Sequence, residues 1–297
     1  MIAGLVLLAG GAAVGLFGSL LGLGGGILLV PLLTLGFGRP LREAVAISLV
    51  SVIVTSSAGA SVYLRTHVAN LRLGMVLELF TACGALVGGL IAFSLPVPVL
   101  QGLFAALLGY VAISMLRGEP RKAGGAAPVD DALLPRDESP ATTAVSTDVD
   151  RAASAPALQP APTAFVATLG GPGYAVTRLG VGTVGAVFAG VVSALLGVGG
   201  GIVKVPLMNL AMGVPLKVAT ATSNMMIGIT ATSSAVIYLL RDEIDPYVAG
   251  PVALGVFAGA SVGARVGNRV DTRLLRMLFV VVLLVTALQM GAKAVGL

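Results

Sequence analysis

The chain has 297 residues, of which 57% are hydrophobic and 10% charged, and its mean hydropathy is +1.01. Soluble domains are about 45–50% apolar and about 25% charged, so this composition excludes a soluble protein and predicts an all-α polytopic membrane protein. The net charge of +5 does not indicate nucleic acid as a partner. Seven of the 13 acidic residues lie between residues 118 and 163, and the basic remainder is expected in loops at the lipid surface.

Eight apolar runs reach the length of about 17–25 residues that a helix needs to cross a bilayer. In chain order they lie at about 2–20, 44–64, 73–95, 97–116, 177–196, 218–240, 247–264 and 274–292. Shorter apolar runs follow at about 27–37 and 202–213. The first run has no basic residues before it, so we expect it to be a membrane helix of the mature protein rather than a signal peptide.

Each short run is separated from the long run before it by a cluster of glycines. The cluster Gly22, Gly24, Gly25 and Gly26 returns as Gly197, Gly199, Gly200 and Gly201. A glycine inside a helix costs about 1 kcal/mol relative to alanine and readily takes positive φ, so we expect a broken helix at both clusters. Transporters use broken helices to build binding sites near the middle of the membrane. We therefore predict that these eight glycines contribute to a substrate site.

The two clusters belong to an internal repeat. An offset of 175 aligns residues 20–88 with 195–263 without a gap, and 26 of the 69 pairs are identical. Between the repeats, 18 of the 46 residues from 118 to 163 are Ala or Pro, a composition typical of disorder. We predict a first transmembrane repeat at 1–117, a disordered acidic linker at 118–175 and a second repeat at 176–297.

The basic residues predict that the two repeats are inverted. The loop at 93–99 has no charge, whereas the equivalent loop of the second repeat carries Arg265, Arg269, Arg273 and Arg276. Because Lys and Arg gather in cytoplasmic loops, we expect the first of these loops outside and the second in the cytoplasm. The loop with Arg39 and Arg42 and its equivalent with Lys217 are both basic, so this pair does not separate the two sides.

Three kinds of small or isolated residue have structural interpretations. The glycines Gly255, Gly259, Gly263 and Gly267 recur every four residues, with Gly84 and Gly88 in the first repeat, and we expect them to pack helices closely. The single cysteine, Cys83, is expected to be a small buried residue. The single histidine, His67, is expected to be satisfied or solvated, without a catalytic role.

The sequence contains no arrangement of residues that indicates an enzyme, a bound cofactor or a metal. Gly22 to Ile27 lacks the third glycine of a dinucleotide fingerprint, and Val205 follows Lys204 where a phosphate loop needs Ser or Thr. No paired carboxylates or metal-binding pattern lie near His67.

Polar residues within the apolar runs are the remaining candidates for a binding site. Lys204 follows the second glycine cluster, and the equivalent residue of the first repeat is Leu29, so the fold does not require a cation there. A cation at membrane depth is usually functional, although Lys204 also has a stem long enough to reach an interface. We predict that Ser48, Ser223 and Asn224 supply neutral donors beside it. Glu78 is interpreted as an interfacial carboxylate, with a proton carrier as the alternative.

Each glycine cluster is followed by Val-Pro, at Val30-Pro31 and Val205-Pro206, and then by alanines that precede Ser48 or Ser223. With this doubled motif the chain resembles the TauE/SafE family of sulfite and organosulfonate exporters. The resemblance implies a multi-pass transporter of the cytoplasmic membrane that moves a small anion such as sulfite or a sulfonate.

We therefore expect a secondary anion transporter, acting as an exporter. Its energy would come from an ion gradient, of H⁺ or Na⁺, or from the substrate's own gradient, because the sequence has no nucleotide-binding segment. Two alternatives remain: a passive anion channel, and an intramembrane enzyme or accessory subunit. The sequence does not indicate the anion, the coupling ion or the oligomeric state.

Overall fold

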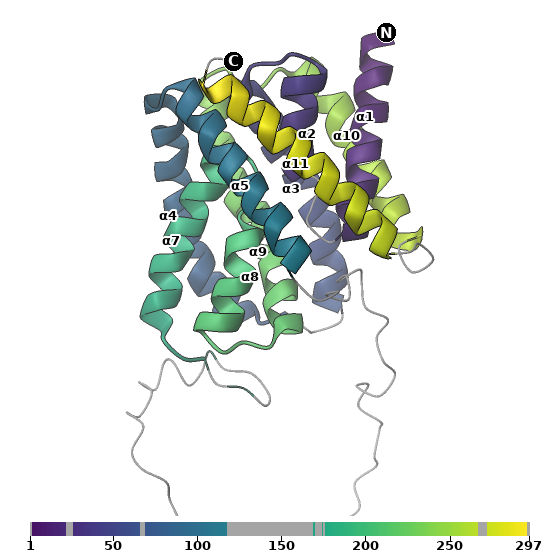
Figure 1. The fold of residues 1–297 in the computed structure, drawn as a ribbon. Helices are drawn as coiled ribbons and strands as arrows, with labels where there is room; N and C mark the ends of the chain where they lie inside the picture. The colour runs from purple at the N-terminus through teal and green to yellow at the C-terminus, as the bar shows by residue number, and fades with distance from the viewer. Residues whose placement is uncertain are drawn as a thin grey trace, which may run out of the picture.

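The computed structural model describes residues 2–21, 26–65, 69–117, 169, 174, 176–266 and 272–295, and helices dominate these residues (Figure 1). The first repeat contains α1 (Ile2–Leu21), α2 (Gly26–Pro31), η1 (Leu32–Gly36), α3 (Leu41–Arg65), α4 (Leu71–Ser94) and α5 (Val97–Arg117). The second contains α7 (Leu179–Leu196), α8 (Gly201–Pro206), η3 (Leu207–Ala211), α9 (Leu216–Leu240), α10 (Pro246–Val266) and α11 (Thr272–Val295). The two series match element by element, as the sequence repeat predicts.

Five helices are long and apolar enough to cross a membrane by length and composition. They cover Leu71–Ser94, Val97–Leu116, Leu179–Leu196, Leu216–Leu240 and Pro246–Gly263. Shorter apolar helical stretches lie at Gly4–Ser19, Gly26–Gly36, Gly201–Ala211 and Phe279–Val295. The chain is thus a helical, multi-pass membrane protein, while the count of eight spanning helices stays a prediction.

One turn of π-helix follows each of the two short helices. Pro31 and Pro206 are the last residues of α2 and α8, and the chain continues directly into η1 and η3. Proline has no N–H to donate to the α-helical ladder, and the wider hydrogen-bonding pattern of a π turn accommodates that missing donor. The proline that recurs at the same distance from both glycine clusters therefore marks the same local distortion in both repeats.

The two repeats pack by exchanging their first helices. α1 of the first repeat lies along α10 of the second, and α7 of the second lies along α4 of the first. α3 also packs on α9, and α5 on α11, which run side by side in Figure 1. The exchange means that the core is shared between the halves and that neither half encloses one alone.

Glycines allow the closest of these helix contacts. A Cβ on Gly259 of α10 would collide with the backbone oxygen of Ala12 in α1, and one on Gly255 would collide with that of Leu8. In the matching pair, Gly84 of α4 faces the backbone of Val187 in α7, and Gly88 that of Val191. The prediction that these glycines pack helices is confirmed; Gly267 lies outside the described residues.

The connections gather at two ends of the bundle. At one end, Arg42 of α3 donates to the carbonyl oxygens of Phe93 and Leu95, and the Arg39 guanidinium lies 3.9 Å from the Asp245 carboxylate. At the other end, the Asn70 amide donates to Leu169 O and to the Tyr174 hydroxyl, and Thr177 N–H donates to Met212 O. The loops at 37–40 and 241–245 therefore lie at the first end, and those at 69–70 and 212–215 at the second.

The expectation that Cys83 is buried is wrong. Its side chain is exposed on the outer face of α4, next to other exposed apolar residues such as Phe80 and Val87. A membrane helix is apolar on the face toward lipid as well as on the face toward the core, so composition does not separate the two faces.

Candidate functional site

The second glycine cluster breaks the helix between α7 and α8. Gly197, Gly199 and Gly200 have φ of 68°, 80° and 73°, values that favour glycine over any residue with a side chain. Gly197 caps the C-terminus of α7. Gly200 caps the N-terminus of α8, and its carbonyl oxygen accepts hydrogen bonds from the N–H groups of Val203 and Lys204. The predicted break is confirmed here. In the first cluster, Gly22, Gly24 and Gly25 lie outside the described residues, and α2 begins at Gly26.

The two breaks lie against each other. A Cβ on Gly26 would lie 2.8 Å from the carbonyl oxygen of Gly197, too close for any side chain. The Ser48 hydroxyl on α3 bridges them, since it lies 2.7 Å from Gly197 O and 3.2 Å from Gly26 O and donates to these carbonyls. Ser48 is fully buried, so at this point it ties the repeats together within the protein interior.

Lys204 lies beside this junction and is paired. Its ammonium group donates to Glu78 Oε2 at 3.1 Å and to the Thr230 hydroxyl at 2.5 Å, and that hydroxyl donates to Glu78 Oε1 at 2.7 Å. The three side chains come from α8, α4 and α9 and form a closed triangle of hydrogen bonds. Lys204 is 2% exposed and Glu78 4%, so the ion pair is isolated from solvent. Charge-assisted hydrogen bonds are strong in such a buried site, and removal of one charge would leave the other buried without compensation, which is strongly destabilising.

The position of Glu78 corrects the sequence interpretation. Glu78 is not an interfacial carboxylate: it is buried, and it compensates the charge of Lys204. Lys204 correspondingly does not reach an interface. The sequence gives no signal for this pairing, because the two residues are 126 positions apart and belong to different repeats.

Two serine hydroxyls near the ion pair have no hydrogen-bond partner among the described residues. Ser193 Oγ and Ser223 Oγ are both buried, with 0% and 1% of their residues exposed. A Cβ on Gly200 would lie 3.3 Å from Ser193 Cβ and 3.5 Å from Lys204 Cε, and one on Gly201 would lie 3.6 Å from Ser223 Oγ. Buried polar groups normally have partners, so these free donors at the break point to a ligand that accepts hydrogen bonds. The sequence singled out Ser223 but missed Ser193.

Asn224 is half-buried, one residue after Ser223 on α9. Successive residues of a helix point about 100° apart, so Asn224 and Ser223 face different neighbours. Of the predicted site residues in the described part of the chain, Gly26, Ser48, Gly197, Gly200, Gly201, Lys204 and Ser223 gather at the junction.

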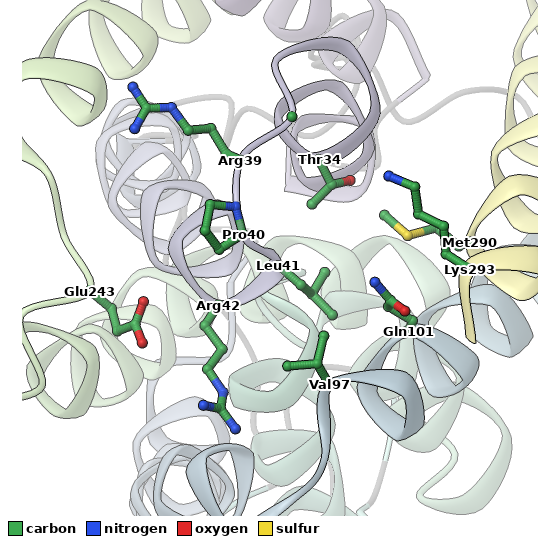
Figure 2. A pocket seen from close by; sticks show the side chains of 11 residues that line it. Thr34, Arg39, Pro40, Leu41, Arg42, Val97, Gln101, Glu243, Met290 and Lys293 are labelled. Atoms are coloured by element: carbon green, nitrogen blue, oxygen red, sulfur yellow. The ribbon is translucent and has the colours of Figure 1, made fainter. Parts of the chain in front are cut away.

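The cavity drawn in Figure 2 lies away from this junction, at the end of the bundle that holds the C-terminus of α11. Its volume is about 360 Å³, and its lining includes Arg39, Arg42, Gln101, Glu243 and Lys293. The Arg39 charge is offset by Glu43 at 3.0 Å and Asp245 at 3.9 Å. None of the residues that line this cavity is a predicted site residue. Among the described residues, no group of three His, Cys, Asp or Glu side chains is placed to hold a metal ion.

Comparison with models of protein families matches residues 7–290 to the family described as "Sulfite exporter TauE/SafE". The match spans both repeats and the segment between them. Searches of curated proteins and of solved structures found no match.

Proposed function

Because the chain belongs to the TauE/SafE sulfite exporter family, we propose that it is a secondary transporter of sulfite or an organosulfonate in the cytoplasmic membrane. It acts as an exporter, powered by an ion gradient or by the gradient of the anion itself. The observation that carries the proposal is the junction of the two glycine breaks, where a buried cation and two free hydroxyls meet between the repeats. Transporters built from repeats bind their substrates at such a midpoint.

The proposed binding site uses the second break most directly. Lys204 supplies the positive charge, and Ser193 and Ser223 donate hydrogen bonds to the oxygens of the anion. Gly22, Gly24, Gly25 and Gly26 of the first break, with Gly197, Gly199, Gly200 and Gly201 of the second, let the backbone approach the substrate closely. Ser48 holds the two breaks together through its bond to Gly197 O. A sulfite or sulfonate group, with three oxygens around sulfur, suits several donors arranged around one cation.

The burial of this site favours a carrier over the alternative of an open anion channel. Ser48, Ser223, Lys204 and Glu78 are each less than 5% exposed, so the described structure is closed around the site. A channel in its conducting state needs a continuous path, whereas alternating access includes a closed conformation.

We further propose that the repeats are inverted. We also propose that the second end of the bundle, where α5 ends and α7 begins and which we call the linker end, faces the cytoplasm. Support comes from the loops at 37–40 and 212–215, which are equivalent in the repeat but lie at opposite ends of the bundle. Charge supports the orientation. At the linker end Arg72, Arg178 and Lys217 form no ion pair with any acidic side chain that the structure describes. At the other end Arg39, Arg42, Arg241 and Lys293 are balanced by Glu43, Asp242, Glu243 and Asp245. Excess basic charge is typical of the cytoplasmic side.

Binding and flux of candidate anions test the proposed function. In a thermal-shift screen of the purified chain, sulfite or a sulfonate at 100 times its dissociation constant should add about 2.7 kcal/mol of stability, while unrelated short carboxylates should not. In proteoliposomes the same anion should show saturable flux that follows its gradient. Flux that rises linearly with concentration without saturation would favour the channel, and stabilisation by none of the sulfur anions would contradict the substrate class.

A further inference from the structure

We propose that Glu78 is a proton-binding site linked to the anion: the anion that binds Lys204 displaces Glu78, and Glu78 takes up a proton as it leaves the ion pair. The inference rests on the proposed function and adds to it the coupling ion and the residue that carries it. It is drawn from the triangle of Lys204, Glu78 and Thr230 at the junction of the repeats.

The ion pair occurs in only one of two equivalent positions of the repeat. At the offset of 175, Lys204 corresponds to Leu29, Glu78 to Ala253 and Thr230 to Thr55. At the equivalent positions, Leu29 of the first repeat and Ala253 of the second are apolar where Lys204 and Glu78 carry charges. Since a buried ion pair is generally no more stabilising than well-packed apolar residues, folding does not explain why the charges are present.

Charge balance links the anion to a proton. With Glu78 ionised, the pair is neutral, and it is buried. An anion bound to Lys204 in that state would leave one uncompensated negative charge in the protein interior. Among the described residues, Lys204 on α8 is the charged group that pairs with Glu78, and Thr230 on α9 is its other partner. Protonation of Glu78 restores neutrality, so the anion and one proton bind together.

Thr230 allows the exchange without loss of a hydrogen bond. Its hydroxyl now donates to Glu78 Oε1 at 2.7 Å, but the carbonyl oxygen of Met226 lies 3.1 Å away as a second acceptor. When Glu78 takes a proton from water on Oε1, the Thr230 hydroxyl turns its hydrogen to Met226 O and accepts from Glu78. The Lys204 hydrogen that was bonded to Oε2 is then donated to an oxygen of the anion. Release of the anion reverses each step and returns the proton to water.

The direction of coupling follows from joint binding. The anion and the proton cross the membrane in the same direction, and for a monoanion the cycle moves no net charge. Export therefore runs on the concentration gradient of the anion, and a pH gradient that is alkaline inside drives the anion inward.

Proton uptake on binding tests the inference. The probe is ethanesulfonate, which keeps one negative charge across the working range, whereas sulfite itself titrates near neutral pH. Calorimetry of the full chain in two sulfonate-free buffers with different heats of ionisation counts the protons taken up. We expect about one proton per anion at pH 8 and a dissociation constant that rises about tenfold per pH unit. Glu78→Gln should bind with no proton uptake and no pH dependence. Glu43→Gln, which removes a partly exposed carboxylate on α3, should behave like wild type.

The outcomes separate the two proposals. Binding by the wild type without proton uptake, or equal uptake by Glu78→Gln, would overturn the role of Glu78 and leave the transporter assignment intact. If Glu78→Gln does not fold, the proton count and pH dependence of the wild type decide the question. Absence of binding by both ethanesulfonate and sulfite would overturn both proposals.

Discussion

The pairing of Lys204 with Glu78 changes what removal of either residue should do. A lone lysine at this depth could be replaced by an apolar residue at no cost in stability, because a cation is unfavourable there. In the structure, however, loss of Lys204 leaves the Glu78 carboxylate buried at 4% exposure without its counter-charge. The two residues therefore have to be varied together.

We predict that Lys204→Met lowers the free energy of unfolding by about 3–5 kcal/mol, because it isolates a buried carboxylate. Lys204→Met combined with Glu78→Gln should recover most of that loss, since the double variant has no charge to bury. Unfolding in detergent micelles measures both. Lys217→Met, at an exposed position near the start of α9, is the control and should stay within about 0.5 kcal/mol of wild type. Equal losses in the single and double variants would mean that the pair is not coupled.

Anion binding gives a second prediction at this site. The double variant keeps the fold but lacks the cation, so the dissociation constant should rise about 10- to 150-fold, as expected for one charge-assisted hydrogen bond of about 1.5–3 kcal/mol. The single variant Lys204→Arg keeps the positive charge of the wild type but should not keep its affinity for the anion, because a planar guanidinium does not fit the site of an ammonium. Isothermal titration with sulfite measures both, and unchanged affinity in the double variant would place the anion elsewhere.

At the scale of the elements, glycines set how closely the exchanged helices approach. Gly259 of α10 lies against the backbone oxygen of Ala12 in α1, whereas Gly250 of the same helix has no atom within 4 Å of its Cβ position. These two positions allow a matched comparison of packing and helix propensity.

We predict that Gly259→Ala destabilises the protein by about 1–3 kcal/mol, because the added methyl forces α1 and α10 apart. Gly250→Ala should be neutral or stabilising by up to about 1 kcal/mol, since alanine is the better helix former. Thermal unfolding in detergent compares them. Similar shifts for both variants would show that helix propensity, and not the contact with α1, decides the effect.

The helices themselves were largely predictable, and their partners were not. The apolar run at about 73–95 predicts α4, observed at Leu71–Ser94, because a membrane helix must be continuously apolar. The glycine break at Gly197 was also predictable from local sequence, because glycine is unfavourable inside a helix and readily takes positive φ. The bond between Glu78 and Lys204 was not, because hydropathy along a chain carries no information on which distant residue completes a pair. The exposure of Cys83 was missed because lipid and the protein core select the same residues.

For the whole molecule, the inverted arrangement predicts opposite accessibility of two exposed positions. Ser94 lies at the end of α4 and Lys217 near the start of α9, at the two ends of the bundle. In a Cys83→Ala background, an impermeant maleimide added to intact cells should label Ser94→Cys and spare Lys217→Cys. Labelling of both from outside would contradict the inversion, and labelling of Lys217→Cys alone would reverse the orientation.

Residues 118–163 are predicted to be dispensable for folding. The segment is rich in Ala and Pro and poor in large apolar residues, so it has little surface to bury against its ordering entropy. Replacement by a Gly/Ser linker of equal length should leave membrane insertion and a monodisperse detergent peak unchanged. Loss of either would show that the segment packs against the helices.

The exchange of first helices also determines the order in which helices can pack while the protein is being synthesised. α1 is synthesised well before its packing partner α10, which begins only at Pro246. At a synthesis rate of about 5–20 residues per second, α1 waits on the order of tens of seconds for the surface that its glycines fit. During that interval Gly11 and Gly15, which will face the backbone of α10, lie open to lipid or to a chaperone. α1 is therefore made long before the surface that completes its packing exists, whereas α7 finds its partner α4 already synthesised.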